Sequence, residues 1–91
     1  MSPMSLGDFA VRVATGIGLP APNGGHTPES AAWGLLGRGI RLRADLAAPL
    51  TEADAVGALV GLGYRIRTTT PSRVMSRDRA EAILRTFLET P

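Results

Sequence analysis

Three segments of this chain open in the same way, with an apolar residue, then Ser or Thr, then a short, mostly polar stretch that leads into apolar residues at helical spacing. A Ser or Thr hydroxyl accepts a hydrogen bond from an unpaired amide of the first helical turn, and the apolar residue before it packs back against the helix. The recurrence predicts helices that are copies of one unit, packed around a shared aliphatic core. The three openings are Met4-Ser5, Leu50-Thr51 and Met75-Ser76.

The apolar pattern predicts four helices. Residues Leu6–Ile17 and Arg77–Leu88 each carry one apolar stripe, and Pro28–Arg38 begins after a Thr cap with Pro at its first position. Residues Glu52–Leu62 are apolar nearly all round, which predicts a helix at the centre of the domain. The predicted fold class is mainly α, a small bundle of four short helices made from internally repeated units.

The length of 91 residues fits one small domain, residues 1–91. Residues 1–49 form a first repeat-like unit, and residues 50–91 form a second and a partial third. Residues 19–27 contain two Pro, two Gly and an Asn, which predicts an exposed loop. Because a core of this size contributes little net stability, we also expect a second copy or a partner protein to cover apolar surface.

Two short segments, Ile40–Arg43 and Tyr64–Arg67, alternate apolar residues with Arg. Such alternation is typical of a half-buried extended segment. Two interpretations follow. The segments pair as a two-stranded ribbon, or each is the extended exit of the helix before it.

The basic residues are all Arg, and ten of them against eight acids give a net charge of only +2. No acid lies between Ala55 and Arg77, so the basic charge accumulates there. A face of Arg side chains binds phosphate or carboxylate groups through forked hydrogen bonds, which makes nucleic-acid binding an alternative function. The candidate binding face consists of Arg41, Arg43, Arg65, Arg67, Arg73 and Arg77.

The sequence carries no motif for catalysis, for a metal or for a cofactor. There is no Cys, and His26 is the single histidine, so the three or four ligands of a zinc site cannot be assembled. The acids Asp8, Glu52, Asp54 and Asp78 all fall in first helical turns, where capping and the helix dipole account for them. We therefore expect no enzymatic activity, no cofactor and no metal.

The order of elements resembles the S-layer-homology repeat. In that family a hydrophobic-Thr-Arg-Ala-Glu stretch opens one helix, and a second helix with an early Trp ends in Gly-Ile. The resemblance implies a helical scaffold of the bacterial cell envelope. The stretches of this chain that match the pattern are Met4–Ala10, Ala32–Ile40, Leu50–Ala55 and Met75–Arg77.

The chain also departs from the family's pattern at two positions. In the family the Arg of the opening tetrapeptide grips anionic cell-wall polymer, and here its place holds Leu6 and Glu52, with only Arg77 retained. The acidic place, filled by Asp8 and Asp54, is Arg79 in the third copy. The resemblance therefore implies that the scaffold is kept while most of the polymer-binding chemistry is lost.

Taken together, these features predict a non-catalytic protein-interaction or cell-envelope-associated module that acts by assembly or partner docking. Its partner is another protein or a second copy of the chain, and anionic cell-wall glycan is the second alternative ligand beside nucleic acid. The apolar runs are too short to span a membrane and no export signal is evident, so we expect a soluble chain, cytoplasmic as written or of the envelope if excised from a longer protein. The candidate partner or core surface consists of Trp33, Leu36 and Tyr64.

Overall fold

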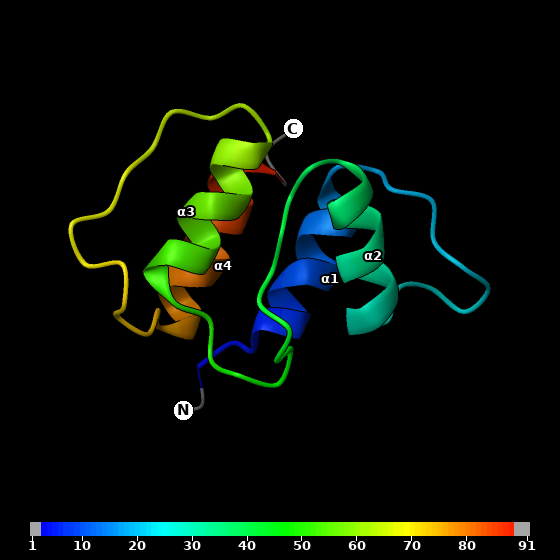
Figure 1. The fold of residues 1–91 in the computed structure, drawn as a ribbon, viewed down its shortest axis with the longest axis horizontal. Coiled ribbons are helices and arrows are strands. Elements are labelled where there is room, and N and C mark those ends of the chain that lie inside the picture. The colour runs from blue at the N-terminus through cyan, green and yellow to red at the C-terminus, as the bar shows by residue number, and fades with distance from the viewer. Residues whose placement is uncertain (1–2, 89–91) are drawn as a thin grey trace.

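The computed structural model describes residues 3–88 and is mainly helical, as predicted (Figure 1). Its helices are α1 (Leu6–Gly16), α2 (Pro28–Gly37), α3 (Glu52–Gly61) and α4 (Arg77–Phe87). Within residues 3–88 β-structure is limited to two isolated bridges, Ser5 with Pro49 and Thr51 with Val74. The four predicted helices are therefore confirmed.

The hydroxyl caps that mark the repeated unit are also confirmed. The Ser5 Oγ accepts a hydrogen bond from the Asp8 amide at 3.0 Å, and the Thr51 Oγ1 accepts one from the Asp54 amide at 3.3 Å. In α4 the Ser76 Oγ accepts from the Arg79 amide at 3.2 Å. Each hydroxyl satisfies one amide that a helix leaves unpaired at its start, and this fixes where the helix begins.

The apolar residues before these caps form the centre of the fold. Met4, Leu50 and Met75 are all buried. Their backbones are also bonded in series, since the Leu50 amide donates to the Met4 carbonyl at 2.9 Å and the Met75 amide donates to the Leu50 carbonyl at 2.8 Å. We call this arrangement the central ladder. It joins the starts of α1, α3 and α4, so the three copies meet at equivalent residues.

The linker that leads into each following copy closes the first turn of the helix that opens the copy before it. Two further amides at the start of α1, and two at the start of α3, donate to carbonyls of these linkers. The two sets of bonds are equivalent in position, which makes the internal repetition a property of the fold as well as of the sequence. The pairs are Leu6 to Ala48 and Gly7 to Leu46 in the first copy, and Glu52 to Arg73 and Ala53 to Pro71 in the second.

The central helix is α1, and the prediction that α3 lies at the centre is wrong. Helix α1 packs against both α2 and α4, and six of its residues are buried, with Phe9 the largest. In α3 the side chain of Val60 is 52% exposed. The apolar character of α3 comes largely from Ala and Gly, which gain little from burial and therefore tolerate solvent on one face. Figure 1 shows α1 beside α2 on one side of the molecule and α3 with α4 on the other.

The predicted ribbon is not formed, because Ile40–Arg43 and Tyr64–Arg67 do not pair with each other. The second interpretation holds, since each segment leaves a helix through a glycine with positive φ. These are Gly39 with φ 85° and Gly63 with φ 100°, conformations that glycine adopts without a steric penalty. The residue after each glycine donates its amide back to the helix, Ile40 to Leu35 and Tyr64 to Leu59.

Candidate functional site

A groove of about 370 Å³ lies between α2 and the segment that follows it. One wall is a face of α2 and the other is the chain from Arg41 to Leu46. Most of the lining surface is apolar, and its charged side chains are one acid, Glu29, and two bases, Arg41 and Arg43. We call it the Trp33 groove, and it is lined by Glu29, Ala32, Trp33, Leu36, Arg41, Leu42, Arg43, Ala44 and Leu46.

Trp33 is 74% exposed and Leu36 is 44% exposed, although both are large apolar side chains. The reason is helix geometry. The buried residues of α2 are Ala31 and Leu35, four positions apart, and Trp33 lies midway between them in sequence and so on the opposite face. The groove wall of α2 is a second face, whose members Glu29, Ala32, Trp33 and Leu36 follow the spacing i, i+3, i+4, i+7.

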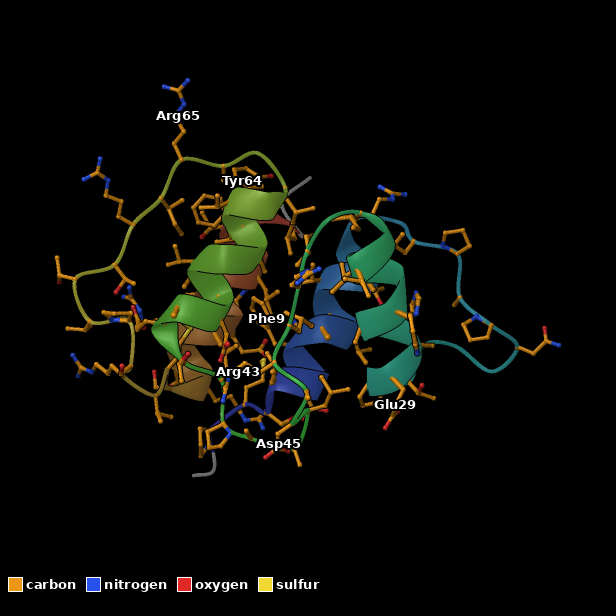
Figure 2. The ribbon with its side chains drawn as sticks, in the orientation of Figure 1. Phe9, Glu29, Arg43, Asp45, Tyr64 and Arg65 are labelled. Carbon is orange, nitrogen blue, oxygen red and sulfur yellow. The ribbon has the colours of Figure 1, made fainter. Side chains whose placement is uncertain are left out.

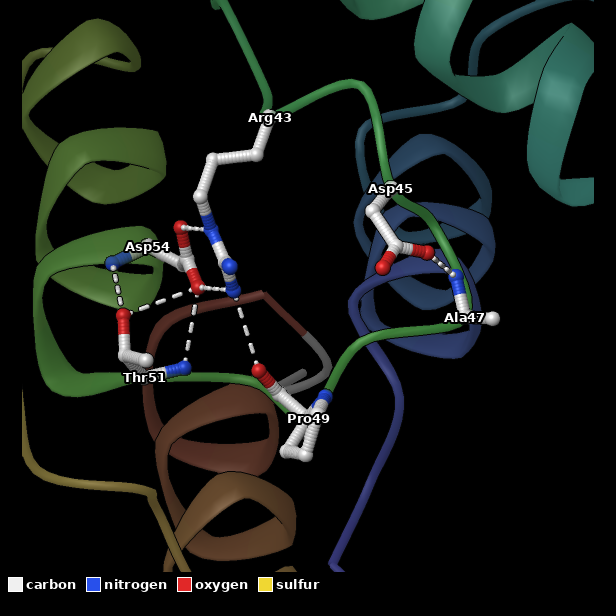
Figure 3. A network of polar contacts seen from close by, with 6 residues as sticks. All are labelled: Arg43, Asp45, Ala47, Pro49, Thr51 and Asp54. Carbon is white, nitrogen blue, oxygen red and sulfur yellow. Dashed lines mark hydrogen bonds and ion pairs between the residues drawn. The ribbon is translucent and has the colours of Figure 1, made fainter.

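The far wall of the groove ends in a polar network around Asp54 (Figure 3). Arg43 donates from Nε to Asp54 Oδ1 at 3.0 Å, and from Nη2 to Asp54 Oδ2 at 2.6 Å and to the Pro49 carbonyl at 3.0 Å. The same Oδ2 accepts from the Thr51 amide at 2.9 Å and from the Thr51 hydroxyl at 2.8 Å. Arg43 therefore ties the linker to α3, and its charge is neutralised in place.

Burial alone would raise the pKa of Asp54, but the hydrogen bonds from Arg43 and Thr51 together outweigh burial and hold this pKa below the ordinary 3.8. A lowered carboxyl pKa adds stability above the ordinary value, and that stability is lost as the pH falls through the folded value. At about pH 7 we expect wild type to exceed Asp54→Asn in unfolding free energy by on the order of 1 kcal/mol, mainly from the hydrogen bonds with Thr51 that close the first turn of α3. The ion pair adds little, because the Arg43 side chain is exposed and its charge is screened by solvent.

Urea unfolding of wild type and Asp54→Asn at a series of pH values from about 7 to about 2 tests this expectation. The difference in unfolding free energy between the two proteins should disappear at acid pH, where Asp54 is protonated. The control is Arg43→Gln, which breaks the same network from its other end. The double variant should be no less stable than Asp54→Asn alone, because the two residues act as one unit. A gap that stays constant down to the lowest pH would contradict the role given to the Asp54 carboxylate.

The six candidate Arg residues do not gather on one face. Arg41 lies in the Trp33 groove and Arg43 is bound to Asp54. Arg65 and Arg67 are exposed on the connection between α3 and α4, and Figure 2 shows Arg65 pointing away from the helices. The remaining two line different pockets. Arg73 lines a pocket with Glu52 and Arg79, and Arg77 lines another with Met4, Asp8 and His26.

Tyr64 serves the fold. Its hydroxyl donates to the Phe87 carbonyl at 2.8 Å, and its ring meets the Phe87 ring edge-on with centroids 5.0 Å apart. This contact ties the exit of α3 to the last turn of α4, where carbonyl groups lack helical partners. Tyr64 does not line the Trp33 groove. Of the three candidate surface residues, only Trp33 and Leu36 lie together there.

Glu52 and Arg79 stand where the S-layer-homology pattern has an Arg and an acid, and here they bind each other. Arg79 donates from Nε to Glu52 Oε2 at 3.0 Å and from Nη2 to Glu52 Oε1 at 3.3 Å. Glu52 is buried, so the paired Arg offsets the cost of removing its carboxylate from water. The pair joins α3 to α4 across the start of both helices.

His26 also has a place in the fold. Its Nε2 lies 3.1 Å from the Leu19 carbonyl oxygen and its Nδ1 lies 3.4 Å from the Ser30 Oγ, so the ring links the two ends of the loop between α1 and α2. In the described part of the chain, no three His, Asp or Glu side chains are placed to hold a metal ion together. Among the helices described, none has the length and apolar character needed to cross a membrane.

Sequence reasoning found Trp33, Leu36 and Arg41 but missed the residues that complete the groove, chiefly Glu29, Leu42 and Leu46. The signal for Glu29 was available, since it lies four residues before Trp33 on the same helical face. Leu42 and Leu46 gave no such signal, because their position depends on where the glycine turn after α2 sends the chain.

No family model, no curated protein and no solved structure matches this chain. The resemblance to the S-layer-homology repeat therefore stays a prediction. What the chain does has to be argued from its own residues.

Proposed function

We propose that this chain is a non-catalytic docking module that binds a partner protein through the Trp33 groove. The observation that carries the proposal is that Trp33 is 74% exposed to solvent and lies beside Leu36 on the wall of an apolar groove. Exposed aromatic and aliphatic side chains at a concave surface are typical of protein-binding sites, where Trp is among the residues that contribute most. Assembly with a partner remains the role, within the cell envelope or elsewhere.

The single tryptophan makes the proposal testable, because all the tryptophan fluorescence of the protein comes from the groove. Replacing Trp33 by Ala should weaken binding of the partner protein. It should leave the fold intact, because the Trp33 side chain is mostly exposed to solvent. We expect loss of at least about tenfold in affinity, the effect of a typical aromatic hot spot. Wild type, Trp33→Ala and the control Val60→Ala, an exposed residue of α3, are immobilised and used to capture proteins from extract.

Proteins that wild type and Val60→Ala retain, and Trp33→Ala loses, are then purified and titrated against the chain. Their binding should shift the fluorescence of Trp33. Capture of the same proteins by all three variants, with no shift on titration, would contradict docking at this groove.

A second candidate is nucleic-acid binding by the connection between α3 and α4. The observation in its favour is that Arg65, Arg67 and Arg73 are exposed there and make no ion pair within residues 3–88. Affinity for nucleic acid that falls steeply with salt, and that is lost on replacing these three residues by Gln, would favour it.

Anchoring on anionic cell-wall polymer is tested separately. It requires that the protein be retained on purified polymer and that Arg77→Ala abolish this retention.

A further inference from the structure

We propose that a pocket between the starts of α3 and α4 binds a phosphate monoester. The pocket has a volume of about 300 Å³ and lies where the second copy of the repeated unit meets the third. It shares no residue with the Trp33 groove, so the inference goes beyond the proposed docking function. We call it the second-junction pocket, and it is lined by Glu52, Thr70, Arg73, Val74, Met75, Ser76 and Arg79.

Among the described residues that line this pocket, Glu52 is the single acid, and its carboxylate is already satisfied. Arg79 donates to Oε2 at 3.0 Å and to Oε1 at 3.3 Å, and the Thr68 hydroxyl donates to Oε1 at 3.5 Å. The Glu52 side chain is also buried, with 7% of its surface exposed. Its negative charge is balanced in place by Arg79, so the pair presents little net charge to a ligand.

The side-chain groups that remain open in the pocket are hydrogen-bond donors. Within residues 3–88 the Arg73 guanidinium makes no hydrogen bond and no ion pair. Arg79 binds Glu52 through Nε and Nη2, which leaves its Nη1 available. The Ser76 Oγ accepts from the Arg79 amide, but its own proton has no acceptor in that part of the chain. A ligand that carries negative charge and accepts several hydrogen bonds therefore complements the pocket.

Backbone bonds hold Arg73 at the pocket. Its amide donates to the Thr70 carbonyl at 3.1 Å, which closes a turn with Pro71 at the second position, where proline is favoured. Its carbonyl accepts from the Glu52 amide at 2.9 Å. The main chain of Arg73 is thus tied to the linker and to the first residue of α3, so binding a ligand costs mainly the freedom of its side chain.

The junction between the first and second copies shows what is particular to the second-junction pocket. The backbone and cap bonds set the correspondence, in which Ala48 takes the place of Arg73 and Asp54 takes the place of Arg79. Asp54 and Arg79 each belong to a closed ion pair. Arg73 is therefore an additional positive charge that the scaffold does not require, because Ala48 makes the same backbone bond without it.

The number of donors favours phosphate over carboxylate. A phosphate monoester presents three terminal oxygens and carries roughly 1.5 to 2 negative charges at about pH 7. The Arg73 fork can bind two of these oxygens, and Arg79 Nη1 or the Ser76 hydroxyl can donate to the third. A carboxylate has two oxygens and a single charge, so it gains the fork alone.

The test is an NMR titration of the full chain with inorganic phosphate and with phenyl phosphate, at constant ionic strength set by sodium chloride. We expect the amides of Ser76–Arg79 to shift, with dissociation constants on the order of 1 mM. Benzoate carries the same ring on a carboxylate, and dimethyl phosphate is a diester like the backbone of nucleic acid. Both should bind at least about fivefold more weakly than phenyl phosphate.

Arg73→Gln should weaken the binding of phenyl phosphate by about tenfold, because the fork and its charge are lost. The matched control is Arg67→Gln, which removes the same charge from the same connection but does not line the pocket. We expect it to change the dissociation constant by less than about twofold. Both side chains are exposed, so both variants should keep the urea midpoint of wild type.

Equal weakening by the two variants would show a general attraction to the basic connection between α3 and α4 and would overturn the pocket. Benzoate or dimethyl phosphate that bound as tightly as phenyl phosphate would overturn the assignment of a monoester. The absence of a shift at Ser76–Arg79 up to about 20 mM phosphate would overturn the proposal as a whole. The Trp33 groove is judged separately by the capture experiment, because it shares no residue with this pocket.

Discussion

The variant Leu50→Ala is expected to lose about 2–5 kcal/mol of unfolding free energy, which is a large share of what a domain of this size has. Leu50 is fully buried, and it is the middle residue of the central ladder, bonded through its amide to Met4 and through its carbonyl to Met75. Alanine keeps both backbone bonds but leaves a cavity where the three copies meet. Neighbouring residues are held by those bonds and cannot collapse into it, which places the expected loss towards the upper end of the range.

Urea unfolding followed by circular dichroism measures this loss, and the control is Val74→Ala. Val74 immediately precedes Met75 in the third copy and is 49% exposed, so its truncation should cost well under 1 kcal/mol. If the two variants were equally stable, the central ladder would not be the core of the fold.

Substitution of Gly7 by Ala should destabilise the protein by about 1–3 kcal/mol, although alanine is the better helix former. Gly7 is buried in α1, and a β-carbon there would lie 2.8 Å from the Pro28 Cβ and 3.0 Å from the Leu46 carbonyl oxygen. Both neighbours are fixed, Pro28 as the first residue of α2 and Leu46 by the bond that its carbonyl accepts from the Gly7 amide. The absence of a side chain at Gly7 therefore lets α1, α2 and the linker approach one another.

The matched control is Gly57→Ala in α3. A β-carbon at Gly57 meets no atom within 4 Å, so only helix propensity changes, and we expect a gain of about 0.5–1 kcal/mol. Thermal and urea unfolding of the two variants should thus move in opposite directions. A stabilising effect of Gly7→Ala would show that α2 does not pack against α1 at this point.

The helices and their starts could be predicted because their signals are local. Ser5, Thr51 and Ser76 each act on an amide three residues ahead, and no distant part of the chain is needed to place them. The apolar residue before each cap was expected to pack against its own helix. The finding that Met4, Leu50 and Met75 bond to one another could not be foreseen, because it depends on how the copies are arranged.

The position of α3 and the shape of the groove depended on tertiary structure. An all-apolar pattern in α3 predicts a central helix, but small side chains such as Ala53 and Gly57 leave burial undecided. In the groove, the apolar residue Trp33 could be selected from the sequence as part of a core or partner surface, but not assigned to one. Burial of Ala31 and Leu35 decides the orientation of α2, because the face that carries them packs inward and Trp33 on the opposite face is left exposed.

The series of bonds through Met4, Leu50 and Met75 also bears on synthesis by the ribosome. Of the four helices, the one that starts after Met75 is made after the others, and until it has emerged the carbonyl of Leu50 lacks its partner and the inner face of α1 lacks α4. A nascent chain that ends between α3 and α4 therefore exposes aliphatic side chains of α1. The shared core of the four helices is completed only when α4 has joined it, and a chain stalled before that point is open to aggregation.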